Sequence, residues 1–222
     1  MEKRKIIIGD YDTAANGWTL ASLKLSDATR KTNYVDKTAG DGSWDLSTAL
    51  SDGIPRYNDR TLTVKLECSE GTRLERKALI RTMLNGLDGM QKQIVLPDDP
   101  DYYLDGVVHV AKDYNDLAHA SVTVTAVCHP WLYKKSETTQ TFTASTTAKT
   151  ATLPNSGRLV VIPKITVSGS SASVVVVSGT ASKTFSAGTY QWPYLIVRPG
   201  GQAITYSGSG TIKFTYREAV LE

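Results

Sequence analysis

The chain has 222 residues, of which 41% are hydrophobic and 21% charged, and its formal net charge is +3. This composition excludes collagen, coiled coil and intrinsic disorder, and it fits one large or two small globular domains. No apolar run approaches the roughly 20 residues of a membrane-spanning helix, and the apolar stretch after Met1 is too short for a secretory signal, so we expect synthesis in the cytoplasm and no membrane insertion.

Charge is distributed unevenly along the chain. Residues 137–222 contain seven basic and three acidic residues, a net charge of +4, and the remainder contains 18 basic and 19 acidic residues, a net charge of −1. The C-terminal part is also rich in Ser, Thr, Val and Gly. This change predicts two domains, residues 1–136 and 137–222. The weak overall charge argues against direct nucleic-acid binding.

The N-terminal part begins with short strand patterns. Residues 5–8 predict a strand, and Asn16-Gly17 between residues 11–15 and 18–25 predicts a hairpin. Residues 26–60 lack periodicity and predict a long excursion with short strands. Residues 60–68 then alternate apolar and polar side chains, which indicates a half-buried strand.

One helix is predicted after this strand. Thr72 and Glu75 form a capping box, and an apolar face follows at helical spacing until Gly89. That face consists of Leu79, Ile80, Met83, Leu84 and Leu87. Beyond it we expect a strand over residues 92–96 and a hairpin of residues 102–112 and 119–128.

From Thr139 onward every segment has the pattern of a short strand. Turn-forming Gly-Ser clusters separate the segments, including those at Gly169 and Gly208. This pattern predicts an antiparallel β-sandwich. The predicted fold class is therefore mainly β (α+β), with a β-rich N-terminal domain that carries one α-helix and a C-terminal sandwich.

The two cysteines, Cys68 and Cys128, lie far apart without a CxxC motif. Such spacing favours reduced, partly buried thiols at strand ends over a disulfide.

The chain contains none of the common catalytic or phosphate-binding motifs, and we expect neither catalytic residues nor cofactors. His109, His119 and Asp105 could hold zinc if the hairpin brought them together, but strand histidines are far more often structural. Asp98, Asp99 and Asp101 concentrate carboxylates in one turn. A calcium site there lacks further ligands, so a solvated acidic turn is favoured and no metal is expected.

Two further groups of residues leave alternatives open. Arg73, Lys77 and Arg81 form a basic ridge along the helix, which is typical of a solvated face, a protein contact or a weak nucleic-acid contact. The aromatic residues Trp44, Tyr190 and Trp192 either fill a core or bind a ligand such as a sugar, and core packing is the commoner role.

The order of the segments resembles a known family, the distal tail (Dit) proteins of long-tailed siphovirus phages. In the N-terminal half the resemblance rests on three stretches, Gly40-Asp41-Gly42-Ser43-Trp44-Asp45-Leu46, Pro55-Arg56-Tyr57 and Arg60-Thr61-Leu62. It continues through residues 96–106, which are similar to the family's D-D-P-x-Y-Y-x-G-R signature, with Val107 where Arg is usual. In the C-terminal half it comprises residues 155–157, 163–167, 193–200 and 211–217.

The resemblance implies a structural protein of the virion and not an enzyme. It implies a hexameric ring formed by the N-terminal domain, with a galectin-like sandwich outside the ring. Such a ring joins the tail tube to the tail tip or baseplate and the host-adsorption apparatus. The implied partners are other copies of the chain, the tail tube protein, the tail-tip or tail-associated hub protein and a receptor-binding protein.

Two hypotheses about sites accompany this interpretation. The first places the ridge of Arg73, Lys77 and Arg81 against Asp98, Asp99 and Asp101 of the neighbouring subunit, since a ring needs different surfaces on its two sides. The alternative function is a carbohydrate-binding sandwich that contacts a host glycan through Tyr190 and Trp192. A metallohydrolase has almost no support in the sequence.

Overall fold

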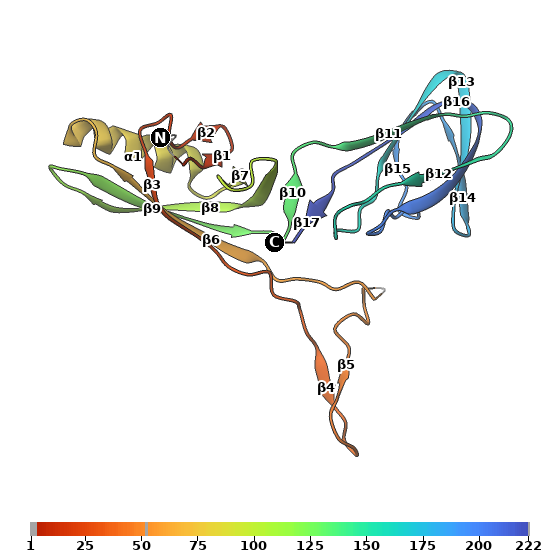
Figure 1. Cartoon of the computed structure of the whole chain (residues 1–222), viewed down its shortest axis with the longest axis horizontal. Coiled ribbons are helices and arrows are strands. Elements are labelled where there is room, and N and C mark those ends of the chain that lie inside the picture. Colours follow the sequence, from red (N-terminus) through yellow and green to blue (C-terminus); the bar gives the residue numbers. More distant parts are fainter. Residues whose placement is uncertain (1–3, 52, 222) are drawn as a thin grey trace. The chain divides into compact units, whose positions relative to one another are not determined.

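The computed structural model describes residues 4–51 and 53–221, and the described chain forms two compact units. The first unit extends to Leu132 and includes Leu221, and the second spans Tyr133–Val220. The fold is mainly β with one helix, as the sequence predicted (Figure 1). The helix is too short to span a membrane, and no described helix qualifies as a membrane span.

The first unit is built on a curled antiparallel sheet. Its strands follow the order β2-β1-β7-β8-β9-β6-β3. They are β1 (Ile7–Ile8), β2 (Tyr11–Asp12), β3 (Thr19–Leu25), β6 (Arg60–Cys68), β7 (Met90–Val95), β8 (Tyr102–Asn115) and β9 (Ala120–Cys128). In β6 the side chains of Leu62, Val64 and Leu66 are buried, whereas Lys65 and Glu67 lie on the opposite, partly solvent-exposed face. The predicted alternation is therefore confirmed.

Helix α1 (Arg73–Leu87) packs on the sheet beside β8 (Figure 1). The predicted capping box is present, since the Thr72 hydroxyl accepts from the Glu75 amide and the Glu75 carboxylate accepts from the Thr72 amide. Ile80, Met83 and Leu87 are buried against the sheet. Leu79 and Leu84, predicted on the same face, are only half-buried.

Arg76 is buried although the helix pattern marks it as polar. Its guanidinium donates to the carbonyls of Gly71, Asp116 and Leu117 at 2.6, 2.9 and 3.0 Å. These bonds connect the start of the helix to the turn between β8 and β9. Because the carbonyls lie up to 41 residues away in sequence, helical spacing alone cannot reveal this role.

The hairpin predicted at Asn16-Gly17 does not form. The turn exists, with Gly17 at φ 80 and the Trp18 amide donating to the Thr13 carbonyl. The strands on its two sides pair elsewhere, β2 with β1 and β3 with β6. Trp18 is fully buried beside Tyr11, whose hydroxyl accepts from its indole nitrogen. Core packing therefore determines the strand partners after this turn.

The second unit is a sandwich whose two layers share two long bent strands, β13 (Lys164–Ser178) and β16 (Gln202–Tyr216) (Figure 1). In one layer, β15 (Gly188–Gln191) pairs with the Lys164 end of β13, and β11 (Thr138–Thr143) pairs with the Tyr216 end of β16. In the other layer, β14 (Ala181–Ser186) pairs with the Ser178 end of β13, and β12 (Lys149–Leu153) pairs with the Gln202 end of β16. Short strands β10 (Leu132–Lys134) and β17 (Ala219–Val220) pair with each other and do not belong to the six-stranded sheet of the sandwich, because β10 extends the sheet that contains β8.

The Gly-Ser clusters at Gly169 and Gly208 are bends within these strands and not the turns that the sequence predicted. The pairing of β13 with β16 shifts register between Ser168 and Ser173. Gly208 has φ +123, and a Cβ placed there would lie 2.0 Å from the Ser173 carbonyl oxygen. Only glycine allows the two backbones to approach this closely.

Both cysteines are free and lie at strand ends, as predicted, but they are buried and not half-buried, because both side chains point into the core of the first unit. Burial raises the pKa of the Cys128 thiol to about 12, so it stays protonated and unreactive at neutral pH.

Glu218 is a buried carboxylate that organises one end of the sandwich. It accepts from the Thr138 hydroxyl at 2.7 Å and from the amide and hydroxyl of Ser156. Burial raises the pKa of its carboxyl, but the bonds from Ser156 and Thr138 outweigh this effect, and the pKa lies below its ordinary value of 4.5.

We expect the substitution Glu218→Gln to lower the free energy of unfolding of the sandwich by about 1–2 kcal/mol at pH 7. Since the folded-state pKa is depressed, the carboxylate's contribution is complete above pH 4.5 and is lost as the pH falls through the folded pKa. The difference from wild type should therefore shrink below pH 4.5 in urea unfolding. The exposed residue Glu137 provides the control, because Glu137→Gln should have little effect. A difference that is independent of pH would contradict the assignment.

Candidate assembly site

An arm projects from the first unit between β3 and β6 (Figure 1). It consists of residues 26–59 and carries β4 (Tyr34–Asp36) and β5 (Ser43–Asp45), which form a separate two-stranded sheet. At the base of the arm, the Arg60 side chain donates a hydrogen bond to the Ser26 carbonyl at 2.7 Å. Backbone hydrogen bonds add to it, among them the one from the Lys31 amide to the Arg56 carbonyl. The predicted excursion with short strands is confirmed.

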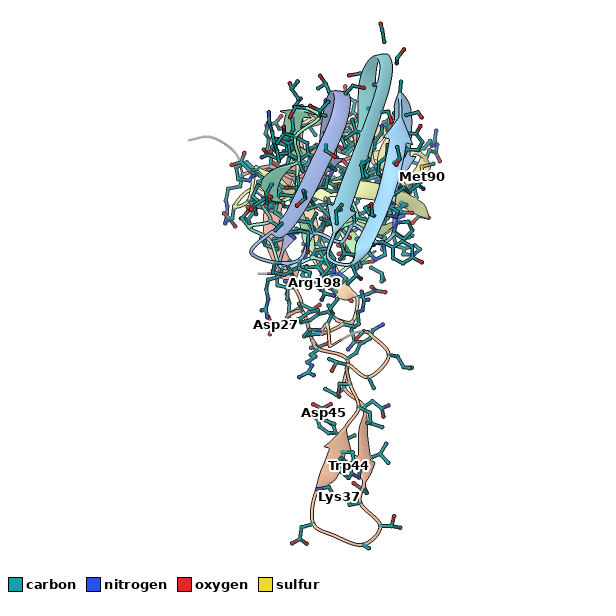
Figure 2. The ribbon with its side chains drawn as sticks, turned by 90° about the vertical axis from the view of Figure 1, so that its right-hand side faces the viewer. Asp27, Lys37, Trp44, Asp45, Met90 and Arg198 are labelled. Atoms are coloured by element: carbon teal, nitrogen blue, oxygen red, sulfur yellow. The ribbon has the colours of Figure 1, made fainter. Side chains whose placement is uncertain are left out.

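Both faces of the arm's hairpin are exposed (Figure 2). Val35 and Trp44 are cross-strand partners and share one face, where the Lys37 ammonium lies 5.0 Å from the centre of the Trp44 ring. Tyr34 and Asp45 form the opposite pair. Trp44 is 61% exposed, so core packing, the commoner role for such a residue, is wrong here. An isolated two-stranded hairpin is only marginally stable in water, and such a surface is typical of an interface.

A second surface lies at the other end of the first unit, between α1 and the end of β8. Here a groove of about 650 Å³ has apolar side chains from the helix and basic side chains from both elements. Its lining residues are Arg73, Leu74, Lys77, Ile80, Arg81, Leu84, Lys112 and Asn115. We call this surface the basic groove.

The basic ridge predicted on the helix forms one side of this groove, and Lys112 of β8 adds a fourth cation. None of Arg73, Lys77, Arg81 and Lys112 forms a salt bridge with a carboxylate in the described part of the chain. Leu74 is 76% exposed at the same place. The groove therefore offers uncompensated positive charge beside apolar surface.

The acidic turn, residues 98–101, lies at the opposite end of β8. Asp98 accepts from the Arg4 guanidinium at 2.5 and 2.6 Å, and the Asp99 carbonyl accepts from the Tyr102 amide at 3.1 Å. Lys112, the first groove residue on β8, lies eleven residues beyond Asp101, so the acidic turn and the basic groove are about 36 Å apart along the strand. The predicted pairing of ridge and acidic turn can therefore occur only between copies.

The structure does not bring together the side chains of the two metal sites that the sequence suggests. His109 lies 3.7 Å from Asp88, and His119 lies 3.6 Å from Asp116, near the tip of the hairpin. The Asp105 carboxylate contacts neither histidine in these ion pairs and accepts a hydrogen bond from the Gln91 side-chain amide. No group of three or more metal-ligating side chains occurs in residues 4–51 and 53–221.

We expect the purified chain to retain well under one equivalent of zinc or calcium when it is prepared without chelator. His109→Ala and His119→Ala should change the free energy of unfolding by less than about 1 kcal/mol, because both side chains are substantially exposed. Elemental analysis by mass spectrometry measures the metal content. One equivalent of metal that is lost in either variant would contradict this prediction.

The residues proposed to contact a glycan do not form an exposed aromatic surface. Trp192 is 4% exposed and packs edge-on against Phe185, so it belongs to the sandwich core and cannot stack on a sugar. Tyr190 is partly buried against the same ring. The exposed aromatic residue of this region is Tyr194, at 71%. The glycan hypothesis thereby loses its main residue.

Sequence reasoning missed two components of the candidate site, Lys112 and Leu74, and favoured the wrong role for a third, Trp44. Lys112 belongs to a strand, so nothing in its local pattern connects it with the helix ridge. Leu74 falls outside the apolar face and is exposed. For Trp44 a signal exists in the sequence, because the residue stands in the glycine- and aspartate-rich segment 40–46 without apolar alternation around it.

The first unit combines a curled antiparallel sheet, a helix packed on it and an exposed arm, and the second unit is a sandwich built on two bent strands. This is the fold of the SPP1 Dit protein (gp 19.1), whose crystal structure is described as a paradigm of the hub adsorption apparatus in phages that infect Gram-positive bacteria. The two chains are 15% identical, and the match covers 97% of this chain and 99% of SPP1 Dit with a TM-score of 0.70. The predicted resemblance to Dit proteins is confirmed at the level of the fold.

Two structures of the phage p2 baseplate in its activated conformation, with Sr and with Ca, also match. Their TM-scores are 0.45 and 0.44 at 10% and 9% identity, and each match covers 97% of this chain and 98% of that chain. No sequence profile of a protein family and no curated protein sequence matches the chain.

Proposed function

We propose that this protein is a structural hub of a phage tail, located in the virion at the distal end of the tail. The observation that carries the proposal is the likeness to SPP1 Dit over 97% of the chain. The hub joins the tail tube protein to the tail-tip or tail-associated hub protein, and a receptor-binding protein is a further partner. The role is one of assembly and not of catalysis.

We further propose that six copies form a closed ring through the first unit. A ring requires each copy to present two different, complementary surfaces. The arm and the basic groove lie at opposite ends of β6, and the basic groove and the acidic turn lie at opposite ends of β8. Exposed strand edges in the arm add backbone groups that can pair with a neighbour. Charges of Asp98, Asp99 and Asp101 on one copy and of Arg73, Lys77 and Arg81 on the next favour head-to-tail approach.

The test is the mass and shape of the full chain in solution. Sedimentation velocity and negative-stain imaging over a wide concentration range should show six-membered rings at high concentration. Antibodies against the protein should label the distal tail end of the phage that encodes it. A chain that stays monomeric at all concentrations, or labelling of the capsid, would overturn the proposal.

A further inference from the structure

The second unit carries a large excess of positive charge. Residues Tyr133–Val220 contain nine basic and two acidic residues, whereas the rest of the chain contains 16 basic and 20 acidic residues. Both carboxylates of this unit are occupied, since Glu137 lies 3.2 Å from the Arg217 guanidinium and Glu218 accepts from Thr138 and Ser156. Residues 138–217 include no aspartate or glutamate. The other cations of the sandwich therefore find no free carboxylate within their own unit.

Two of these cations, Lys164 of β13 and Lys213 of β16, lie on one outer face of the sandwich. Their strand neighbours Ile165 and Phe214 are fully buried in the core, so the alternation of side chains directs both lysines outward. Lys213 is the cross-strand partner of Thr166, which is two residues from Lys164. The two lysines are therefore diagonal neighbours, with backbones about 7–8 Å apart.

Hydroxyl groups surround the two lysines. On either side the sheet continues to β11 and β15, whose outward side chains are also polar. The register gives two rows of four side chains, of which the first is Thr139, Thr215, Lys164 and Gln191, and the second is Thr141, Lys213, Thr166 and Thr189. The hydroxyl oxygens of Thr166 and Thr189 are 3.4 Å apart, so the strands present these side chains on one side of the sheet. We call these side chains the lysine–threonine face.

The chemistry of the lysine–threonine face suits a hydrophilic polyanion. Ammonium groups and neighbouring hydroxyls donate hydrogen bonds of the kind that phosphate oxygens accept. A protein partner needs an apolar centre in its interface, and none of these side chains supplies one. The like charges of the two lysines repel each other, and an anion bound between them relieves this repulsion. A flexible chain of phosphate diesters meets these conditions, because successive phosphates can reach both cations.

We propose that the lysine–threonine face binds a flexible phosphate-diester polymer with polyol repeats, of the poly(glycerol phosphate) type. Its phosphates lie at Lys164 and Lys213, and its hydroxyls exchange hydrogen bonds with the threonines and with Gln191. The inference goes beyond the proposed hub and concerns each copy of the sandwich by itself. Since only two cations contact the polymer, binding to one copy is weak and decreases as the salt concentration rises.

Titration calorimetry of the full chain with oligo(glycerol phosphate) at low ionic strength tests the proposal. Lys164→Gln with Lys213→Gln should weaken binding roughly tenfold or more, because it removes both charge-assisted contacts. The matched control is Lys149→Gln with Lys183→Gln, which makes the same change in net charge on exposed lysines of β12 and β14 in the other layer. It should weaken binding less than about twofold. Absence of binding by the wild-type chain, or equal losses in the two variants, would overturn the proposal.

Removal of hydroxyl groups separates recognition of the polymer from attraction by charge alone. Thr141→Val with Thr166→Val keeps every charge and suits a β-strand, and it should still weaken binding about threefold. An affinity equal to that of the wild-type chain would show that charge alone acts, which contradicts the assigned role of the face. Circular dichroism of each variant confirms that the sandwich remains folded.

Three other probes, compared at equal concentrations of negative charge, distinguish the classes of ligand. Polyglutamate carries carboxylates, single-stranded DNA carries phosphate diesters with bases, and phosphatidylglycerol vesicles present phosphate diesters on a lipid surface. Oligo(glycerol phosphate) should bind more tightly than all three, and equal or tighter binding of any of them would overturn the proposal. Binding is counted per chain, and sedimentation velocity records assembly separately. Failure of the proposed ring therefore leaves the binding result valid, and absence of binding leaves the ring untouched.

Discussion

Residues 1–135, expressed alone, should assemble into a particle of six times their monomer mass, and residues 137–222 should remain monomeric. The candidate contacts, namely the arm, the basic groove and the acidic turn, all lie in the first unit. Each part also keeps a core of its own, with Val64, Met83 and Val124 buried in the first unit and Phe185, Trp192 and Phe214 in the sandwich. Light scattering at high concentration and low salt measures both masses, since salt screens the charges that favour approach.

The full chain serves as the reference for this experiment. It should form the same number of copies as residues 1–135, because the sandwich contributes no contact to the proposed ring. A hexamer of residues 137–222 together with a strictly monomeric N-terminal part under all conditions would contradict the prediction. Loss of assembly in the N-terminal part accompanied by loss of its circular dichroism signal would show that the predicted domain division is wrong.

The substitution Gly208→Val should lower the free energy of unfolding of the sandwich by about 3–5 kcal/mol. The added Cβ would lie 2.0 Å from the Ser173 carbonyl oxygen, and φ +123 is a conformation that side chains with a branched Cβ rarely adopt. Both long strands bend here, so the clash cannot be relieved by moving one flexible side chain. Calorimetry of the full chain should show a lower melting temperature for the sandwich.

Gly179→Val is the matched control, because Gly179 also has positive φ but an added Cβ would meet nothing within 4 Å. It should cost only about 1–2 kcal/mol, the cost of the backbone conformation. The Gly208→Val chain should still assemble, since the contacts of the proposed ring lie in the other unit. Equal losses in the two variants would show that the close approach of the strands is unimportant.

The local patterns of the sequence determined the elements of this protein. The alternation of residues 60–68 predicted β6, and the Thr72–Glu75 capping box predicted the start of α1, because each signal depends on residues within one or two turns or a few strand positions. The change in composition near residue 136 predicted two parts, and the absence of catalytic motifs, together with the order of segments, pointed to a structural role.

Only the tertiary structure decided which elements meet. The strands beside Asn16-Gly17 pair with β1 and β6 because Trp18 enters the core, which outweighs a favourable two-residue turn. The Gly-Ser clusters at Gly169 and Gly208 become bends, since the register of β13 on β16 continues beyond them. Trp192 is buried and Trp44 exposed because one lies between two layers and the other on a hairpin without a cover. Arg76 and Lys112 acquire their roles from residues on other elements, and such long-range proximity has no signature in local sequence.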